Sequence, residues 1–240
     1  KALVPTMPDT FVCPPVVHTI CSDIFHSTKY QKPIRTVLLT GTSGTGKTTN
    51  ARAIAEELGV PIEVFTCNPD TEEFSTVGQM LPNTDKESTA DIEKLCKKLN
   101  IPTFEDVEND FEGAFKMLFG KEPTKYNAQS ECYNEIAKRC CEDNTSARSD
   151  FKFVKSPIIR ALENGWVVEI QEPTIIKRET VLEGLNALLE YGDTATMTLP
   201  TGEVIKRHPD AVVIFTTNLG YAGCKNLQQA VLSRVDVRYD

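Results

Sequence analysis

The sequence predicts an α/β fold built on a parallel sheet, and three observations indicate it. Four short apolar segments have the length and β-branched composition of buried strands: RTVLLTG, VPIEVFTC, WVVEI and AVVIFTTN. Helical patterns separate these segments, and strands that alternate with helices form parallel sheets covered on both faces. The chain has 240 residues, 40% of them hydrophobic, which is enough for one sizeable core. We therefore expect a three-layer αβα arrangement.

The first elements follow a proline-rich lead-in over residues 1–35, in which a short helix is expected over 16–24. The first strand spans 35–41 and ends at Gly41. A helix is expected over 48–58, where alanines and aliphatic residues recur at helical spacing and Gly59 ends the pattern. The second strand spans 60–67. These elements give the order strand, loop, helix, strand.

Residues 85–150 differ in character, and we expect them to form a helical insertion in a core made of 36–84 and 151–240. The segment is charged and helical in pattern, and Pro102, Gly120 and Pro123 interrupt it. Its 15 acidic and 10 basic residues supply most of the net charge of −8. We favour a solvated decoration over a specific docking surface. If the chain recognises a partner, this insertion is where we expect that specificity.

The remaining sequence returns to alternating strands and helices. A helix over 156–165 leads to the third strand at 166–170, and an amphipathic helix is expected over 179–192. The turn residues at 200–202 predict a hairpin within 194–208. The fourth strand spans 211–218, and a last helix is expected over 226–234. No internal repeat is present.

Composition excludes several function classes. The net charge of −8 and the pI of about 5.1 provide no basic field for nucleic acid or an anionic membrane. No apolar run approaches the roughly 20 residues that span a bilayer, and no signal peptide opens the chain. The eight cysteines contain no C-x-x-C pair, so we expect ordinary reduced thiols and a cytoplasmic location. The chain starts at Lys1 rather than at Met, which suggests a trimmed fragment.

Residues 41–48, GTSGTGKT, match the phosphate-binding loop pattern between a strand and a helix. Glycines let backbone N–H groups curl around phosphate oxygens, and the helix start adds the positive end of its dipole. The lysine can reach the β- and γ-phosphates, and Thr48 can ligate Mg²⁺. The predicted nucleotide-binding residues are Gly41, Thr42, Ser43, Gly44, Thr45, Gly46, Lys47, Thr48 and Thr49.

Beyond this loop, the chain resembles the AAA+ ATPases, and among them the MoxR-like and dynein-related group. The resemblance covers most of the chain outside 85–150 and rests on the order and spacing of several segments. These are NPDTEEFSTVGQM after the second strand, IIRALENGWVVEIQEP leading into the Walker B strand, VLEGLNALLE, the sensor 1 strand HPDAVVIFTTN and the arginine-finger segment AVLSRVD. It implies the AAA+ form of the P-loop NTPase core, with ATP and Mg²⁺ as ligands.

The resemblance also implies catalytic roles for three residues. Asn218, at the end of a buried strand, corresponds to sensor 1, whose amide holds the attacking water. Glu172 corresponds to the glutamate that polarises this water. Arg234 corresponds to an arginine finger that acts on the nucleotide of a neighbouring subunit, with Arg238 as a weaker second candidate.

One position departs from the family pattern: Gln171 stands where the Mg²⁺-associated aspartate is expected. Glutamine keeps a carbonyl oxygen but lacks the charge that a hard cation favours. In one interpretation Gln171 holds a metal-bound water and hydrolysis is slower. In a second, Glu169, two residues earlier on the same strand face, supplies the missing charge. In a third the site binds ATP and scarcely turns it over; we favour hydrolysis, because Glu172, Asn218 and Arg234 are all kept.

By resemblance, we expect an ATPase that forms a ring, most often a hexamer, and remodels or activates a partner protein, such as one with a von Willebrand factor A domain. The hairpin within 194–206 resembles the pre-sensor 1 insertion that faces the central pore. The chain stops at Asp240, so we expect the C-terminal α-helical lid to be absent from it. Two rivals remain open: a nucleotide-gated scaffold with little turnover, and a nucleic-acid-dependent McrB-like NTPase, against which the acidic composition speaks.

Overall fold

The computed structural model describes residues 4–82, 89–124, 129–143, 151–218 and 229–239. These form two compact units. The first contains residues up to Val77 and from Ser156 onward, and the second is Gly78–Lys155. The second unit is wider than the insertion expected over 85–150, because it includes a strand on each side of the helices.

A five-stranded parallel sheet forms the centre of the first unit, as predicted. Its strands lie in the order β2 (Ile62–Thr66), β5 (Val167–Gln171), β8 (Val212–Asn218), β1 (Thr36–Gly41) and β9 (Val237–Tyr239). The pairs β1–β8, β5–β8, β2–β5 and β1–β9 are all parallel. All four predicted strands are present; β9 was not predicted. The carboxyl ends of β1, β5 and β8 meet at one edge, where ligands bind in sheets of this kind.

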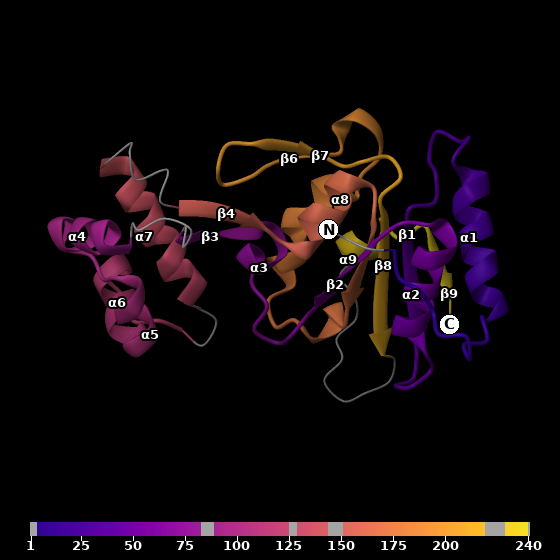
Figure 1. Cartoon of the computed structure of the whole chain (residues 1–240), viewed down its shortest axis with the longest axis horizontal. Helices are drawn as coiled ribbons and strands as arrows, with labels where there is room; N and C mark the ends of the chain where they lie inside the picture. Colours follow the sequence, from indigo (N-terminus) through magenta and orange to yellow (C-terminus); the bar gives the residue numbers. More distant parts are fainter. Residues whose placement is uncertain (1–3, 83–88, 125–128, 144–150, 219–228, 240) are drawn as a thin grey trace. The chain divides into compact units, whose positions relative to one another are not determined.

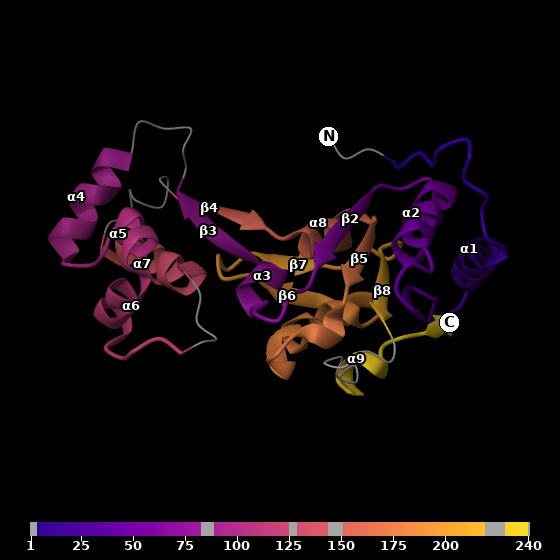
Figure 2. The same cartoon turned by 90° about the horizontal axis from the view of Figure 1, so that it is seen from below.

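Helices cover both faces of this sheet (Figures 1 and 2). The helices α1 (Pro15–Ser27) and α2 (Lys47–Leu58) lie on one side of β8, and α8 (Pro157–Asn164) lies on the other. Gly59 ends α2 in the left-handed conformation, as its position predicts. Residues on one face of the strands pack with α1 and α2 into a hydrophobic core: Val37, Leu39, Val167, Val212 and Ile214. The expected αβα layering is confirmed.

The segment expected to be an amphipathic α-helix over 179–192 is instead a run of 3₁₀ turns, η3 (Glu179–Leu189), followed by η4 (Gly192–Thr194). The β-branched pair Thr180 and Val181 and the mid-segment Gly184 all weaken an α-helix. The apolar residues still face inward, so the prediction of a buried face holds although the helix type was wrong: Val181, Leu182, Leu185, Leu188 and Leu189 are buried.

Shorter elements complete the first unit. They are α3 (Glu73–Val77), η2 (Pro173–Ile175) and α9 (Gln229–Leu232). The helix expected over 226–234 thus ends two residues early, and 226–228 lie outside the described residues. The predicted hairpin is present as β6 (Thr196–Thr198) and β7 (Val204–Lys206), paired antiparallel. Its turn uses Gly202 at φ 85°, a conformation that favours glycine.

The second unit is a helical cluster on a two-stranded antiparallel sheet. The sheet pairs β3 (Gly78–Pro82) with β4 (Phe151–Lys155). The helices are α4 (Thr89–Leu99), α5 (Phe104–Asn109), α6 (Phe111–Phe119) and α7 (Gln129–Asp143). They bury a core that contains Phe115, Leu118 and Ile136. Among the described residues of both units, no helix is long and apolar enough to span a membrane.

Candidate nucleotide-binding site

The loop between β1 and α2 has the backbone that its glycines predict. Gly44 and Gly46 have φ angles of 82° and 85°, which side chains other than glycine rarely allow. A Cβ atom built on either would meet nothing within 4 Å, so open space borders the loop at both glycines. Lys47 follows as the first residue of α2. An open loop at a helix N-terminus is a site for phosphate oxygens.

A cavity of about 350 Å³ lies against this loop. Besides Thr216, which was not predicted, it is lined by predicted site residues from the loop, α2, β5 and β8: Ser43, Gly44, Gly46, Lys47, Thr48, Thr49, Gln171, Glu172 and Asn218. The other three predicted loop residues shape the backbone around it. Lys47 Nζ donates to the carbonyl oxygens of Gly41 and Thr42, and Thr45 Oγ1 donates to that of Thr42.

A chain of hydrogen bonds joins the cation, the amide and the carboxylate in this cavity. Lys47 Nζ donates to Asn218 Oδ1 at 2.8 Å. Asn218 in turn donates from Nδ2 to Glu172 Oε1 and from its backbone N–H to Glu172 Oε2, the latter at 3.2 Å. The structure therefore brings the lysine together with two of the three predicted catalytic residues.

Glu172 has a strained backbone. Its φ of 52° and ψ of 47° are left-handed, a conformation that costs a side-chain-bearing residue about 1–2 kcal/mol. It precedes Pro173, which disfavours the right-handed α region. The bond from its N–H to the carbonyl oxygen of Thr216, at 2.8 Å, holds the turn. Strain of this kind is found where a side chain is aimed for function.

Gln171 uses both ends of its amide. Its Oε1 accepts a hydrogen bond from Thr66 Oγ1 at 2.8 Å, and its Nε2 donates to Thr48 Oγ1 at 3.3 Å. The two predicted metal-binding residues are thus in contact, but the Gln171 oxygen faces Thr66. Mg²⁺ is commonly held by one or two carboxylates together with waters and substrate phosphates. Among the residues that line the cavity, the Thr48 hydroxyl and the Glu172 carboxylate are oxygen ligands that suit Mg²⁺.

Glu169 lies below the cavity rather than in its lining. The side chain is fully buried, and its Oε1 accepts a hydrogen bond from Thr216 Oγ1 at 3.0 Å. Its link to the cavity therefore runs through Thr216. Sequence reasoning missed Thr66 and Thr216. The available signal was a threonine at or near the carboxyl end of a predicted strand, the edge where ligands bind in parallel sheets.

The predicted finger residue Arg234 follows α9 and is not part of the cavity lining. Its Nη2 forms an ion pair with Glu190 Oε1 at 2.9 Å. Arg238 is exposed on β9. Cysteine chemistry is disfavoured near the site, because burial, and then the Glu172 charge, raise the pKa of Cys67 to about 12.

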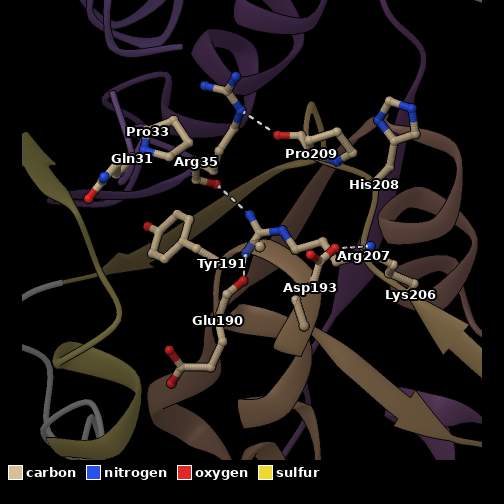
Figure 3. Close-up of a pocket in the computed structure, with 12 residues that line it drawn as sticks. Gln31, Pro33, Arg35, Glu190, Tyr191, Asp193, Lys206, Arg207, His208 and Pro209 are labelled. Carbon is tan, nitrogen blue, oxygen red and sulfur yellow. Dashed lines mark hydrogen bonds and ion pairs between the residues drawn. The ribbon is translucent and has the colours of Figure 1, made fainter. Parts of the chain in front are cut away.

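A second cavity of about 310 Å³ lies at the amino ends of β1 and β8 (Figure 3). Two buried arginines border it. The Arg35 Nε donates to the Pro209 carbonyl oxygen, and Arg207 Nη2 donates to those of Arg35 and Ala211. Arg207 Nη1 donates to the carbonyl oxygens of Leu188 and Glu190. These contacts make both guanidinium groups part of the fold, so we assign the ligand site to the first cavity.

Residues 37–118 match the family model of the "ATPase family associated with various cellular activities (AAA)". The match begins in β1 and includes the whole phosphate-binding loop. This match supports the expectation of an AAA+ P-loop NTPase. It does not distinguish the MoxR-like group within that family.

Uncharacterised relatives extend the similarity over more of the chain. Proteins of Staphylococcus aureus strains USA300 and NCTC 8325 are 24% identical over 200 residues, which is 83% of this chain and 53% of theirs. A Staphylococcus haemolyticus protein is 35% identical over 91 residues, 38% of this chain and 34% of its own. The chain thus spans about half the length of the Staphylococcus aureus relatives.

Among solved structures, one from Cytophaga hutchinsonii named "a putative ATPase" aligns with a TM-score of 0.49 at 11% identity. The alignment covers 94% of this chain and 45% of that one.

Proposed function

We propose that this chain binds ATP with Mg²⁺ and hydrolyses it. The observation that carries the proposal is the hydrogen-bonded series of Lys47, Asn218 and Glu172 in the cavity of the phosphate-binding loop. A Gly-rich turn without a function would not require a cation, an amide and a strained carboxylate to meet in front of it.

Each residue has a definite task in this proposal. The loop amides and Lys47 bind the β- and γ-phosphates, and Thr48 supplies a hydroxyl oxygen to the metal ion. When bound, Mg²⁺ would offset the charge that develops on the transferred phosphoryl group. Glu172 accepts a proton from the attacking water, and the Asn218 amide orients that water. The existing bonds between these two side chains hold them ready at one side of the cavity.

A more specific proposal concerns the role of this ATPase activity. On the sequence resemblance, the chain would form a MoxR-like ring that remodels or activates a partner protein. In such a ring Arg234 acts on the nucleotide of the neighbouring subunit, so its ion pair with Glu190 would have to open. The β6–β7 hairpin would face the pore. A hexameric ring and a partner with a von Willebrand factor A domain belong to this proposal, as does a cytoplasmic location.

A second candidate is a nucleotide-gated scaffold with little turnover. The hydrogen bond from Gln171 Nε2 to Thr48 Oγ1 favours this candidate, because the hydroxyl oxygen that would ligate the metal ion already accepts a bond from an amide N–H. An aspartate at this position would supply negative oxygen instead.

The test is a paired measurement of ATP affinity and steady-state phosphate release. We expect Lys47→Ala to weaken binding, and Glu172→Gln to keep binding but to lower turnover by about 10²–10⁴-fold. Lys116→Ala, which changes an exposed cation in the second unit, is the control. Failure of the unaltered chain to bind ATP would overturn the proposal.

Two further variants separate the candidates. If the chain binds ATP without measurable turnover and Gln171→Asp restores turnover, the scaffold is correct. If the unaltered chain hydrolyses ATP and Arg234→Ala lowers the rate more at high protein concentration than at low, a finger acting between subunits is supported. Stimulation by DNA would favour the McrB-like alternative.

A further inference from the structure

A group of potential metal ligands lies between α1 and α2, away from the nucleotide cavity. Cys13 comes just before α1, His18 is in α1, and Glu57 is in the last turn of α2. One ligand atom of each residue, namely sulfur, ring nitrogen and carboxylate oxygen, lies within 4.8 Å of the other two. Three chemically different donors from two helices and a preceding segment therefore converge at one point.

Two of these ligand atoms are already in contact. His18 Nδ1 lies 2.8 Å from Glu57 Oε2. Tetrahedral zinc binds sulfur, nitrogen and oxygen at about 2.0–2.3 Å, which places its ligands roughly 3.5 Å apart. The present separations, 2.8 Å between His18 and Glu57 and at most 4.8 Å for the other two pairs, differ from this spacing by about 1.3 Å or less. His18 is 63% exposed and Glu57 33%, so rotation about their side-chain bonds is not blocked by a packed core.

The donor set also selects the kind of metal. Thiolate and imidazole are ligands for zinc and similar transition metals, whereas Mg²⁺ and Ca²⁺ favour oxygen alone. Stability of the fold gives little reason for the cluster, because an exposed ion pair contributes at most about 1 kcal/mol. A nearby backbone contact fixes the segment that carries Cys13, since the Met7 N–H donates to Glu56 Oε1 at 3.0 Å.

We propose that Cys13, His18 and Glu57 form a zinc site with three protein ligands and one position open to water. The metal would clamp the segment before α1 onto the C-terminal end of α2. Lys47 stands at the other end of that helix, about 15 Å away along its axis. The site is therefore separate from the nucleotide cavity, and the inference does not depend on the proposed ATPase activity.

The experiment is a competition between the full chain and a chromophoric chelator for Zn²⁺, without nucleotide and with the thiols kept reduced. We expect one equivalent of zinc to bind, and Cys13→Ser, His18→Ala and Glu57→Gln each to weaken binding at least tenfold. The matched controls are His26→Ala and Glu108→Gln, an exposed histidine on α1 and an exposed glutamate on α5 of the second unit. These controls should bind zinc like the unaltered chain.

Co²⁺ provides a second readout that reports directly on the ligands. The unaltered chain should show the visible bands of a tetrahedral site and a sulfur-to-cobalt charge-transfer band, and Cys13→Ser should lose the latter. Circular dichroism of each metal-free variant checks that the fold is kept. Absence of zinc binding, or binding that none of the three variants weakens, would overturn the proposal.

Discussion

The two ends of the central sheet carry two cavities that use cations differently. At the carboxyl ends of the strands, the Lys47 ammonium group contacts two loop carbonyl oxygens and the side chain of Asn218. At the amino ends, Arg207 donates to four backbone carbonyl oxygens and is 5% exposed (Figure 3). The same sheet thus carries a lysine that can exchange its hydrogen-bond partners and an arginine that is held in place by the fold.

The partners of each cation account for this difference. An ammonium on a flexible stem can exchange its hydrogen bonds for bonds to a phosphate oxygen. A buried guanidinium bonded to carbonyl oxygens of four separate residues cannot leave without stranding those acceptors. Desolvation also lowers the pKa of Arg207 to about 10, a cost that its position in the fold must offset. The comparison predicts that substitutions at Lys47 affect ligand binding and substitutions at Arg207 affect stability.

The largest expected effect is that of Arg207→Leu. Loss of the guanidinium leaves buried carbonyl oxygens without donors and should lower the free energy of unfolding by about 3 kcal/mol. For a chain of this size this corresponds to a melting temperature lower by roughly 10 °C. Calorimetry measures the change. Arg160→Leu removes a half-exposed cation paired with Glu63 and should change the free energy of unfolding by less than about 1 kcal/mol. Equal effects would contradict the comparison.

Lys47→Ala should instead weaken ATP binding and leave the stability of the fold nearly unchanged. The loss of charged hydrogen bonds to phosphate should weaken ATP binding by about 10–100-fold. The melting temperature should stay within about 2 °C of the unaltered value, since Lys47 is only partly buried. Titration calorimetry with ATP and thermal unfolding without it provide the two readouts. A stability loss as large as that of Arg207→Leu would show that Lys47 also braces the fold.

Two glycine substitutions sharpen the comparison further. Gly46 and Gly59 flank α2 at φ angles of 85° and 69°, and neither has atoms within 4 Å of a built Cβ. Alanine at either position should therefore cost a similar strain of about 1–2 kcal/mol. ATP affinity, measured by titration calorimetry, should fall at least tenfold for Gly46→Ala alone, because Gly46 lines the nucleotide cavity and Gly59 does not. Equal losses of affinity would instead indicate a general effect on α2.

The smallest expected effect concerns alkaline pH. Burial, and then a hydrogen bond to Asp23, raise the pKa of Tyr239 to about 12 from the ordinary 10.0. A raised pKa stabilises the fold below pH 10, and this contribution is lost as the pH rises through about 12. Tyr239→Phe should therefore lose less stability than the unaltered chain between pH 10 and pH 12. Urea midpoints at several pH values test this; parallel curves would exclude a contribution from Tyr239.

Local pattern was sufficient to predict much of the fold. The four predicted strands are mostly apolar and rich in β-branched residues, and Gly59 alone predicts the end of α2. Elements that depend on distant pairing were not predicted. The strand β9 has three residues and exists because Val237 pairs with Val37, 200 positions earlier. Likewise, β3 and β4 pair across the whole helical unit, so neither carries a recognisable local signal.

The candidate sites divide in the same way. The phosphate-binding loop is contiguous in sequence, so its residues could be predicted, whereas Thr66 entered the site only through its bond to Gln171. The proposed zinc ligands at 13, 18 and 57 match no metal-binding spacing, because the third ligand comes from another helix. The partner of a side chain cannot be read from sequence when it lies on another strand. Thr66 on β2, which binds the Gln171 oxygen, is such a partner.

The last strand has a practical consequence for anyone who shortens this protein. β1 is apolar and would become an outer strand if Val237–Tyr239 were removed, since β9 covers its free edge. Uncovered edges of this composition pair with other chains and promote aggregation. β9 itself is short and carries the exposed Arg238, both of which discourage such pairing. Expression boundaries placed before Val237 are therefore expected to give insoluble protein, even though every residue of the nucleotide cavity would be retained.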